Sequence, residues 1–307
     1  MLKPKDYNQE PIKILKSVNR EISCFCSNDK IEKKNVDEEV VKSFGEEWSK
    51  FYEFSDSDIE NLGKMYFDII EEKMLSHKTY SIDIGCGTGR WTQFLLKKIG
   101  FMEAVDPSDA IFAADKLLEG KENVRLTKAT IDELPFDDET FDFGMSIGVL
   151  HHIPDTQKAM KDCIKKIKIG GYFYTYLYYN LDNKGFTFKL IFKCISIIRK
   201  VVSKMPGNLK KFVCDLLAVF IYMPVILFGR FLKMIGLKRT ANKLPLKGYL
   251  NQSFFVIRND ALDRFGTKLE QRFSKNEIIE MMKNSGLDEI VVSANLPYWH
   301  AVGKRVV

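Results

Sequence analysis

"SIDIGCGTGR", residues Ser81 to Arg90, is the stretch that decides the fold. Three glycines stand at every second position, and glycine weakens both helices and strands. Such a cluster indicates a backbone that another group must approach closely. The apolar run just before the glycines predicts a buried strand, and the residues after them, "GRWTQFLLKKIG", predict a helix.

The alternation of strand and helix continues along the chain. The runs "MEAVD", "NVRLTK", "FDFGMSIGV" and "GYFYTYLYY" predict four more strands, with helices such as "DTQKAMKDCIKKI" between them. Two closing strands are expected in 288–294 and 297–306, after a helix that begins with a capping box from Ser274 to Glu277. We therefore predict an α/β fold, a doubly wound, mostly parallel, seven-stranded Rossmann-like sheet.

Four segments are expected along the 307 residues. Residues 1–78 form a helical N-terminal cap, 79–180 the ligand-binding core, 181–272 a basic and apolar helical insertion, and 273–307 the C-terminal part of the core sheet. The uneven distribution of charge along the chain supports a basic insertion that is distinct from the core. Residues 186–250 carry 13 Lys/Arg and one acid, Asp215, whereas the net charge of the whole chain is only +6.

Composition sets the class of protein and its expected compartment. With 45% apolar and 29% charged residues, the chain is an ordinary globular protein. Its first residues show neither a secretory signal nor a membrane anchor, so we expect a cytoplasmic protein. The six cysteines lack the paired C-x-x-C units of zinc sites, and no metal is expected. The pair Cys24 and Cys26 would be at most half a metal site.

The spacing of the glycines limits the type of ligand. In a doubly wound sheet the ligand lies outside the carboxyl ends of the strands, where the first strand-to-helix turn faces it. A dinucleotide fingerprint would need a third glycine where Arg90 stands. Asp83 precedes the glycines, and Asp106 ends the second strand, where its carboxylate can accept both hydroxyls of a ribose. The pattern predicts a bound nucleoside without evident provision for phosphates.

Three motifs then stand in order: "IDIGCGTGR", "EAVDPSD" and "LPFDDETFDFGMSIGVLHHIPD". With them the sequence resembles the class I S-adenosylmethionine-dependent methyltransferases, most closely the branch of the quinone-biosynthesis methyltransferases. The resemblance runs from about Tyr80 to Tyr178 and resumes from Phe273 to the end. It implies S-adenosyl-L-methionine as the cofactor.

The resemblance also assigns roles to residues. Asp83 and the glycine loop would hold the methionine portion, Asp106 the ribose, and Pro107 the adenine face. Where the family offers an acidic residue to the adenine amino group this chain has Thr130, so the backbone there is expected to bind the ring edge. The complete set of expected cofactor residues is Asp83, Gly85, Cys86, Gly87, Thr88, Gly89, Asp106, Pro107, Thr130, Ile131 and Ser146.

His151 and His152 are the candidate catalytic residues. They follow the strand that borders the site of methyl transfer, and an imidazole titrates near neutrality. An oxygen acceptor of high pKa needs a base, whereas a carboxylate or an ionised phenol does not. Either histidine could serve as the base, or both could be packing residues. Of the other two, His77 is expected at a solvated helix end, and His300 lies on the last strand.

The expected function is S-adenosylmethionine-dependent O-methylation of a small-molecule, quinone-like or lipid-linked glycan acceptor. A noncatalytic cofactor-binding or assembly protein on the same fold is an alternative. A nicotinamide oxidoreductase would need a Tyr-x-x-x-Lys pair, which does not follow the fourth strand. Nucleic acid is a disfavoured acceptor, because the basic residues alternate with aliphatic runs and no Asn-Pro-Pro-aromatic motif is present.

The insertion predicts contact with a membrane surface. The cations of "FTFKLIFKCISIIRKVVSKMP", beginning at Phe186, fall mostly on one helical face. The following "FVCDLLAVFIYMPVILFG" contains Asp215 and Pro224, which favour a bent, shallow hairpin over a span. We expect residues 186–250 to bind an anionic membrane peripherally. A soluble lid over the substrate and a true span are the alternatives.

Overall fold

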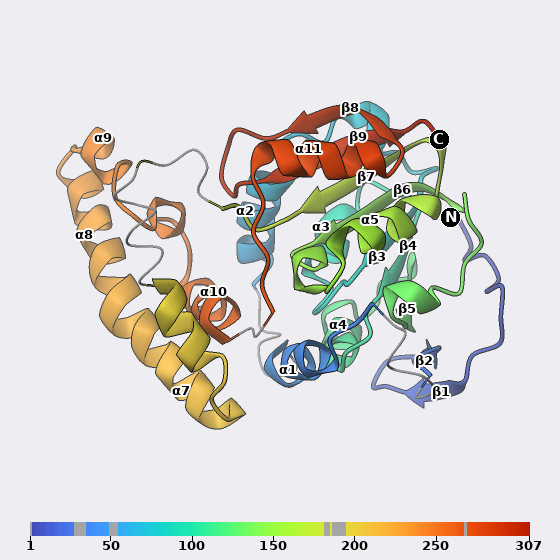
Figure 1. Cartoon of the computed structure of the whole chain (residues 1–307), viewed down its shortest axis with the longest axis horizontal. Coiled ribbons are helices and arrows are strands. Elements are labelled where there is room, and N and C mark those ends of the chain that lie inside the picture. Colours follow the sequence, from blue (N-terminus) through green and yellow to red (C-terminus); the bar gives the residue numbers. More distant parts are fainter. Residues whose placement is uncertain (1, 28–34, 49–54, 181–184, 186–194, 267–268) are drawn as a thin grey trace. The chain divides into compact units, whose positions relative to one another are not determined.

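The chain divides into two compact units. Our computed structural model describes residues 2–27, 35–48, 55–180, 185, 195–266 and 269–307. One unit comprises residues 1–53, 59–182 and 269–307, and the other comprises residues 54–58 and 183–268. The first unit holds the sheet, and the second is built of helices (Figure 1).

The described residues form one nine-stranded sheet in the order β1-β2-β5-β4-β3-β6-β7-β9-β8 (Figure 1). Its strands are β1 (Lys13–Lys16), β2 (Glu21–Cys24), β3 (Tyr80–Ile84), β4 (Phe101–Val105), β5 (Val124–Lys128), β6 (Phe141–Ile147), β7 (Ile167–Tyr176), β8 (Leu287–Val292) and β9 (His300–Arg305). From β5 to β7 all neighbouring strands are parallel, whereas β9 pairs antiparallel with both β7 and β8. This is the doubly wound, mostly parallel, Rossmann-like sheet that the sequence predicted.

The central strands explain the order of the sheet. Every residue of β3 and β4 is buried, as expected for parallel strands with helices on both faces. From β3 the chain winds outward through β4 to β5, then returns to place β6 on the other side of β3. The strand order therefore reverses at the carboxyl end of β3, where the glycine loop begins.

The prediction of seven strands was wrong, because two strands come from the N-terminal segment expected to be helical. β1 and β2 pair antiparallel as a hairpin, and β2 joins the sheet edge parallel to β5. Four-residue strands are too short for a period of two to stand out among charged neighbours. The same segment does contain two helices, α1 (Glu38–Trp48) and α2 (Asp56–Tyr66). Residues 49–54 of this segment lie outside the described residues.

Helices cover both faces of the sheet. On one face α5 (Thr156–Lys165) packs its apolar stripe, including Met160 and Ile164, with Ile278 and Met282 of α11 (Lys275–Asn284). The capping box of Ser274 and Glu277 begins α11, as predicted. The remaining helical elements described in this unit are η2 (Glu72–Met74), α3 (Arg90–Leu95), α4 (Ala110–Leu117), η3 (Ile131–Glu133) and η4 (Leu150–His152).

The second unit contains one long helix where the sequence predicted a bent hairpin. α7 (Gly207–Leu217), the π-helical turn η5 (Ala218–Tyr222) and α8 (Met223–Met234) run on as a single helix of 28 residues. Pro224 cannot donate to the carbonyl one turn back, and the wider π turn next to it accommodates this defect. The described part also contains a helical stretch at residues 195–202 and the shorter elements α9 (Lys238–Ala241), η6 (Lys247–Tyr249) and α10 (Phe254–Gly266). Residues 186–194, where the basic helix was expected to begin, lie outside the described residues.

Candidate active site

The glycine loop leaves one open position at the carboxyl end of β3. Gly85, Gly87 and Gly89 have φ angles of +80°, +54° and +80°, which side chains rarely adopt. A Cβ on Gly85 would lie 2.4 Å from the side chain of Val149, and one on Gly89 would lie 3.0 Å from Leu118. A Cβ on Gly87 would meet nothing within 4 Å. The outer glycines therefore pack the loop, and the middle one faces open space.

Asp106 fixes the glycine loop to the end of β4. Its Oδ2 accepts a hydrogen bond from the Gly87 amide at 2.9 Å, and its Oδ1 accepts from the amide and hydroxyl of Ser108 at 2.8 and 2.6 Å. Burial raises the pKa of Asp106, while these hydrogen bonds act against the rise. The carboxylate predicted to bind a ribose thus lies directly beside the open glycine.

Asp83 is a buried carboxyl group with spare hydrogen-bonding capacity. Its Oδ2 accepts from the Thr92 hydroxyl at 2.7 Å, and its Oδ1 has no partner within the described chain. Burial raises the pKa of Asp83 to about 7, although Thr92 lowers it, and Asp106 adds to the rise. A buried carboxylate is stabilised by a cationic partner. The methionine portion of S-adenosylmethionine carries an ammonium group, so Asp83 fits the cofactor that the resemblance implies.

The other expected cofactor residues divide by exposure. Cys86, Thr88 and Thr130 are buried, whereas Pro107 and Ile131 are partly exposed. The Thr130 hydroxyl donates to Glu133 at 3.0 Å.

Ser146 has a role within the sheet. It is fully buried, and its hydroxyl donates to the Ile84 carbonyl at 2.9 Å. That bond holds β6 against the end of β3, just before the glycine loop. The Ser146 hydroxyl therefore fixes the backbone of Ile84, the residue that precedes the glycine loop.

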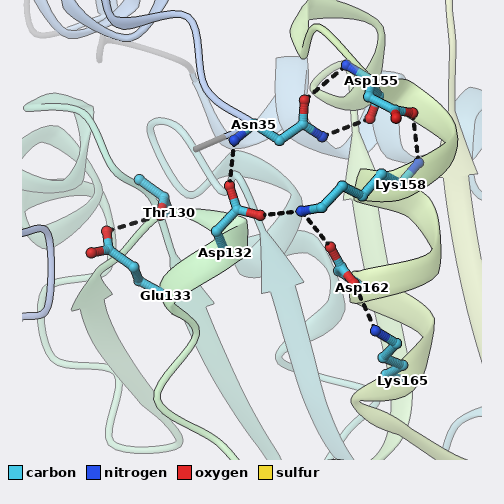
Figure 2. Close-up of polar contacts among 8 residues, drawn as sticks. All are labelled: Asn35, Thr130, Asp132, Glu133, Asp155, Lys158, Asp162 and Lys165. Carbon is cyan, nitrogen blue, oxygen red and sulfur yellow. Dashed lines mark hydrogen bonds and ion pairs between the residues drawn. The ribbon is translucent and has the colours of Figure 1, made fainter. Parts of the chain in front are cut away.

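Asp132, two residues beyond Thr130, belongs to a polar clamp (Figure 2). Its Oδ2 accepts a hydrogen bond from the backbone amide of Asn35 at 2.7 Å, and its Oδ1 accepts one from the Lys158 ammonium on α5 at 2.6 Å. The Asn35 side chain also exchanges two hydrogen bonds with the backbone of Asp155, at 2.7 and 2.8 Å. The clamp fixes the chain to the core three residues before α1 begins.

α1 lies across elements of the site. A Cβ on Gly45 would come within 3.0 Å of the Asp109 amide, three residues beyond Asp106. The ring of Phe44 lies 5.1 Å from that of His152. The N-terminal helix therefore packs close to both the segment that follows Asp106 and the candidate base His152.

The two candidate histidines differ in their surroundings. Both are buried in η4, with ring centroids 4.0 Å apart, and Val149 before them packs on Gly85. The Nδ1 of His152 lies 2.7 Å from the Leu269 carbonyl. Because a carbonyl only accepts, Nδ1 carries a proton, and in the neutral form of the ring the lone pair is then on Nε2.

His151 has a more apolar setting. Its ring stacks on Tyr178 at 4.0 Å, and neither of its ring nitrogens has a hydrogen-bond partner within the described chain. Burial lowers the pKa of His151 well below its usual range. His151 is therefore neutral at physiological pH and behaves as a flat packing group.

A row of aromatic rings that the sequence analysis did not single out lies along the carboxyl edge of the sheet. The distances between ring centroids are 4.4 Å for Trp91 and Tyr66, 5.1 Å for Tyr66 and Tyr176, and 5.8 Å for Tyr176 and Tyr178. Tyr178 in turn stacks on His151. The run "YFYTYLYY" was a usable signal for Tyr176 and Tyr178. Nothing in the sequence indicates that Tyr66, at the end of α2, would join them.

His300 lies in the sheet beside this row, paired with Tyr176. Its Nε2 is 2.6 Å from Asp68, and its Nδ1 is 2.6 Å from the Pro297 carbonyl. Both partners can accept a hydrogen bond, and the ring forms an ion pair with Asp68 when both of its nitrogens carry protons. Burial would raise the pKa of Asp68, but hydrogen bonds from His300 and Asn295 outweigh burial and keep that pKa low. His77, in contrast, is exposed.

Comparison with known proteins agrees with this geometry. Residues 82–175 match the family model described as a methyltransferase domain. Demethylmenaquinone methyltransferase of Staphylococcus aureus strain JH9 is 38% identical over 100 residues, which cover 30% of this chain and 40% of that protein. The same enzyme from strain Newman matches equally. The chain therefore spans less than half the length of these curated relatives.

Solved structures of methyltransferases also resemble the chain. A S-adenosylmethionine-dependent methyltransferase from Thermotoga maritima is 15% identical with a TM-score of 0.46, covering 85% of this chain and 94% of that one. Phosphoethanolamine N-methyltransferase 2 of Haemonchus contortus, solved with S-adenosylhomocysteine, is 15% identical with a TM-score of 0.43, covering 76% of this chain and 38% of that one.

The family model covers β3 through β7, the part of the chain that carries the glycine loop, Asp83 and Asp106. The cofactor of that family is S-adenosylmethionine. The described residues contain no group of three His, Cys, Asp or Glu side chains that could hold a metal ion. Residues 82–175 form a methyltransferase domain of the class I, S-adenosylmethionine-dependent family.

Proposed function

We propose that the protein transfers a methyl group from S-adenosylmethionine to a hydroxyl group of a flat, apolar, quinone-like acceptor. The observation that carries the proposal is the open position at Gly87, whose amide donates to the buried carboxylate of Asp106, in the loop that follows the buried Asp83 of β3. When bound, the cofactor supplies an electrophilic methyl on a sulfonium. The protein has to hold the acceptor in line with that methyl and to take up a proton.

The carboxylates divide the work of binding. The buried carboxylate of Asp83 favours the ammonium group of the methionine portion, because a paired charge costs less to bury. Asp106 already accepts three hydrogen bonds, from the Gly87 amide and from Ser108, so one lone pair, on Oδ2, remains for a ribose hydroxyl. The partly exposed Pro107 and Ile131 are the proposed contacts of the adenine ring.

His152 is the proposed base. The Leu269 carbonyl holds its proton on Nδ1, so the lone pair on Nε2 can accept the proton of an acceptor hydroxyl. His151 lacks such an orienting bond within the described residues, and its low pKa makes it a weak base. We therefore propose that His152 accepts the proton of the acceptor hydroxyl and that His151 has a stacking role.

The aromatic row supports a flat acceptor. Tyr66, Tyr176 and Tyr178 present rings at the carboxyl edge of the sheet, next to the strand end that leads to the histidines. Aromatic rings stack on planar apolar molecules and give them a defined orientation. The named relative acts on demethylmenaquinone, which agrees with an acceptor of this class. A lipid-linked glycan, the other class that the sequence left open, lacks such a planar ring.

The test is incubation of the purified protein with methyl-labelled cofactor and a panel of reduced quinones and phenols. We expect label in an organic-soluble product, with the new methyl on oxygen by mass spectrometry. Binding of the cofactor without label in any acceptor fraction would instead favour the noncatalytic binding protein. Label in nucleic acid would refute the acceptor class.

A matched pair of variants tests the assignment of the base. His152→Asn keeps a side-chain donor for the Leu269 carbonyl and removes Nε2, so kcat should fall by about 10²- to 10⁴-fold with unchanged cofactor affinity. His151→Phe keeps a flat ring against Tyr178 and should retain most of the turnover. Equal losses in the two variants would argue against His152 as the base.

A further inference from the structure

The long helix Gly207–Met234 has two different faces. Its buried residues recur every three or four positions, as on one side of an α-helix. They are Lys210, Cys214, Ala218, Tyr222, Ile226, Gly229 and Leu232. This face packs within the second unit, and α10 is one of its neighbours.

The opposite face is apolar and exposed. Its large side chains are 38 to 77% exposed, although they are bulky hydrophobic groups. They are Leu209, Phe212, Leu216, Val219, Phe220, Ile221, Leu227, Phe228, Phe231 and Met234. Soluble proteins rarely expose a continuous apolar surface of this kind. We call these ten residues the apolar face.

The charges around the apolar face favour one partner. Exposed cations stand beyond both ends of the helix, with Lys200 and Lys204 before it and Lys238, Arg239 and Lys243 after it. The single acid of the helix, Asp215, is held by Arg258 of α10 through contacts of 2.5 and 2.7 Å. The acid is thus neutralised by its own unit, and the surroundings of the apolar face are cationic.

We propose that the apolar face lies in the plane of an anionic lipid membrane, with its aromatic and aliphatic side chains inserted between the lipid headgroups. An apolar surface bordered by cations matches the chemistry of such an interface. The proposal is independent of the methyltransferase activity, because it depends only on residues of the second unit.

The buried face argues for lying in the membrane rather than crossing it. By length and composition, Gly207–Met234 could span a bilayer. A spanning helix would carry its neighbour α10 into the hydrocarbon, together with the ion pairs Arg258–Asp215 and Arg264–Asp260. Charged groups there are costly. A helix in the interface buries only its apolar face and leaves α10 on the side of the water.

Vesicle sedimentation of the full-length chain tests the proposal. The wild type should sediment with vesicles of phosphatidylcholine and phosphatidylglycerol, more weakly with phosphatidylcholine alone, and less in high salt. Phe220→Glu with Phe228→Glu should weaken the binding by at least about tenfold, because each variant places a charge in the apolar layer. The control is Ile169→Glu, the same type of change at a residue of the first unit that is 60% exposed. It should bind like the wild type.

Depth of insertion separates the membrane states. A tryptophan introduced as Phe228→Trp should be quenched by lipids brominated near the headgroup more than by lipids brominated at the chain ends. The reverse order, or resistance to alkaline extraction, would establish a span and overturn the proposal.

Two other results would also overturn it. One is a wild type that stays in the supernatant with every vesicle. The other is lipid-free dimerisation that Phe220→Glu with Phe228→Glu abolishes, which would assign the apolar face to a second copy of the chain. A thermal melt of each variant would show that the fold is intact.

Discussion

At the scale of single residues, Asp83 connects the stability of the protein with its ligand. Its pKa of about 7 lies well above that of an ordinary carboxyl group, because burial favours the neutral form. Near neutral pH the group is therefore poised between its two protonation states. Cofactor binding and protein stability should respond to pH in opposite directions.

Cofactor affinity should increase with pH. A cationic ammonium group pairs with the ionised Asp83, so binding favours loss of its proton. We expect roughly tenfold weaker binding of S-adenosylmethionine at pH 5.5 than at pH 7.5, with proton release on binding near pH 6.5. Calorimetry in two buffers of different ionisation enthalpy measures both. Equal affinity at the two values of pH would contradict the assignment of Asp83.

The contribution of Asp83 to the unfolding free energy should decrease as pH rises. Because the folded-state pKa is raised, the proton stabilises the folded protein, and this contribution is lost as pH rises through about 7. Asp83→Asn removes that dependence. Relative to wild type, the variant should gain up to about 4 kcal/mol of unfolding free energy between pH 4 and pH 8. Urea titrations at several pH values would show it, and a constant difference between the two proteins would refute it.

At the scale of elements, substitutions in the glycine loop can distinguish a loss of unfolding free energy from a loss of cofactor affinity. Gly87→Ala and Gly120→Ala both place a side chain at positive φ, and at both positions a Cβ meets nothing within 4 Å. Each should cost about 1 kcal/mol of unfolding free energy from backbone strain. Only Gly87→Ala should also weaken cofactor binding, because its methyl group enters the proposed site. Equal binding by the two variants would move the cofactor away from Gly87.

The pair of His300 and Asp68 joins β9 to the segment that follows α2. His300→Ala removes the hydrogen bond that the partly exposed carboxylate of Asp68 shares with the ring, so we expect a loss of about 2 kcal/mol in unfolding free energy. The side-chain amide of His300→Gln can replace one of the two hydrogen bonds of the ring, so this variant should lose less unfolding free energy. Denaturant unfolding distinguishes them, and a wild-type midpoint in His300→Ala would show that the pair contributes little.

At the scale of the whole molecule, the second unit interrupts the first without dividing its sheet. The chain leaves and re-enters at adjacent points, because Tyr179 bridges Phe273 and the Asn180 amide donates to the Phe273 carbonyl at 3.1 Å. Replacement of residues 183–268 with a short glycine-serine linker should leave the first unit folded. It should bind S-adenosylmethionine but no longer sediment with anionic vesicles. An unfolded product by circular dichroism would show that the sheet depends on the insertion.

Several elements could be predicted because their signals are local. The strand, the glycine loop and the next helix lie within twenty residues, and the spacing of the glycines places a tight loop directly after the strand. Alternating strands and helices imply a parallel sheet because few other arrangements bury both kinds of element. The capping box of α11 is equally local, since Ser274 and Glu277 satisfy each other's backbone.

The sequence by itself determined the central strands, their order of appearance and the position of the glycine loop, because those features depend on neighbours along the chain. Only the tertiary structure decided that β2 pairs with β5, that Tyr66 meets Trp91, and that Leu269 sets the tautomer of His152. These contacts join residues from 25 to 117 positions apart, and no local pattern encodes them. The same holds for the helix Gly207–Met234: composition shows that it is apolar, but only packing decides which of its faces remains exposed.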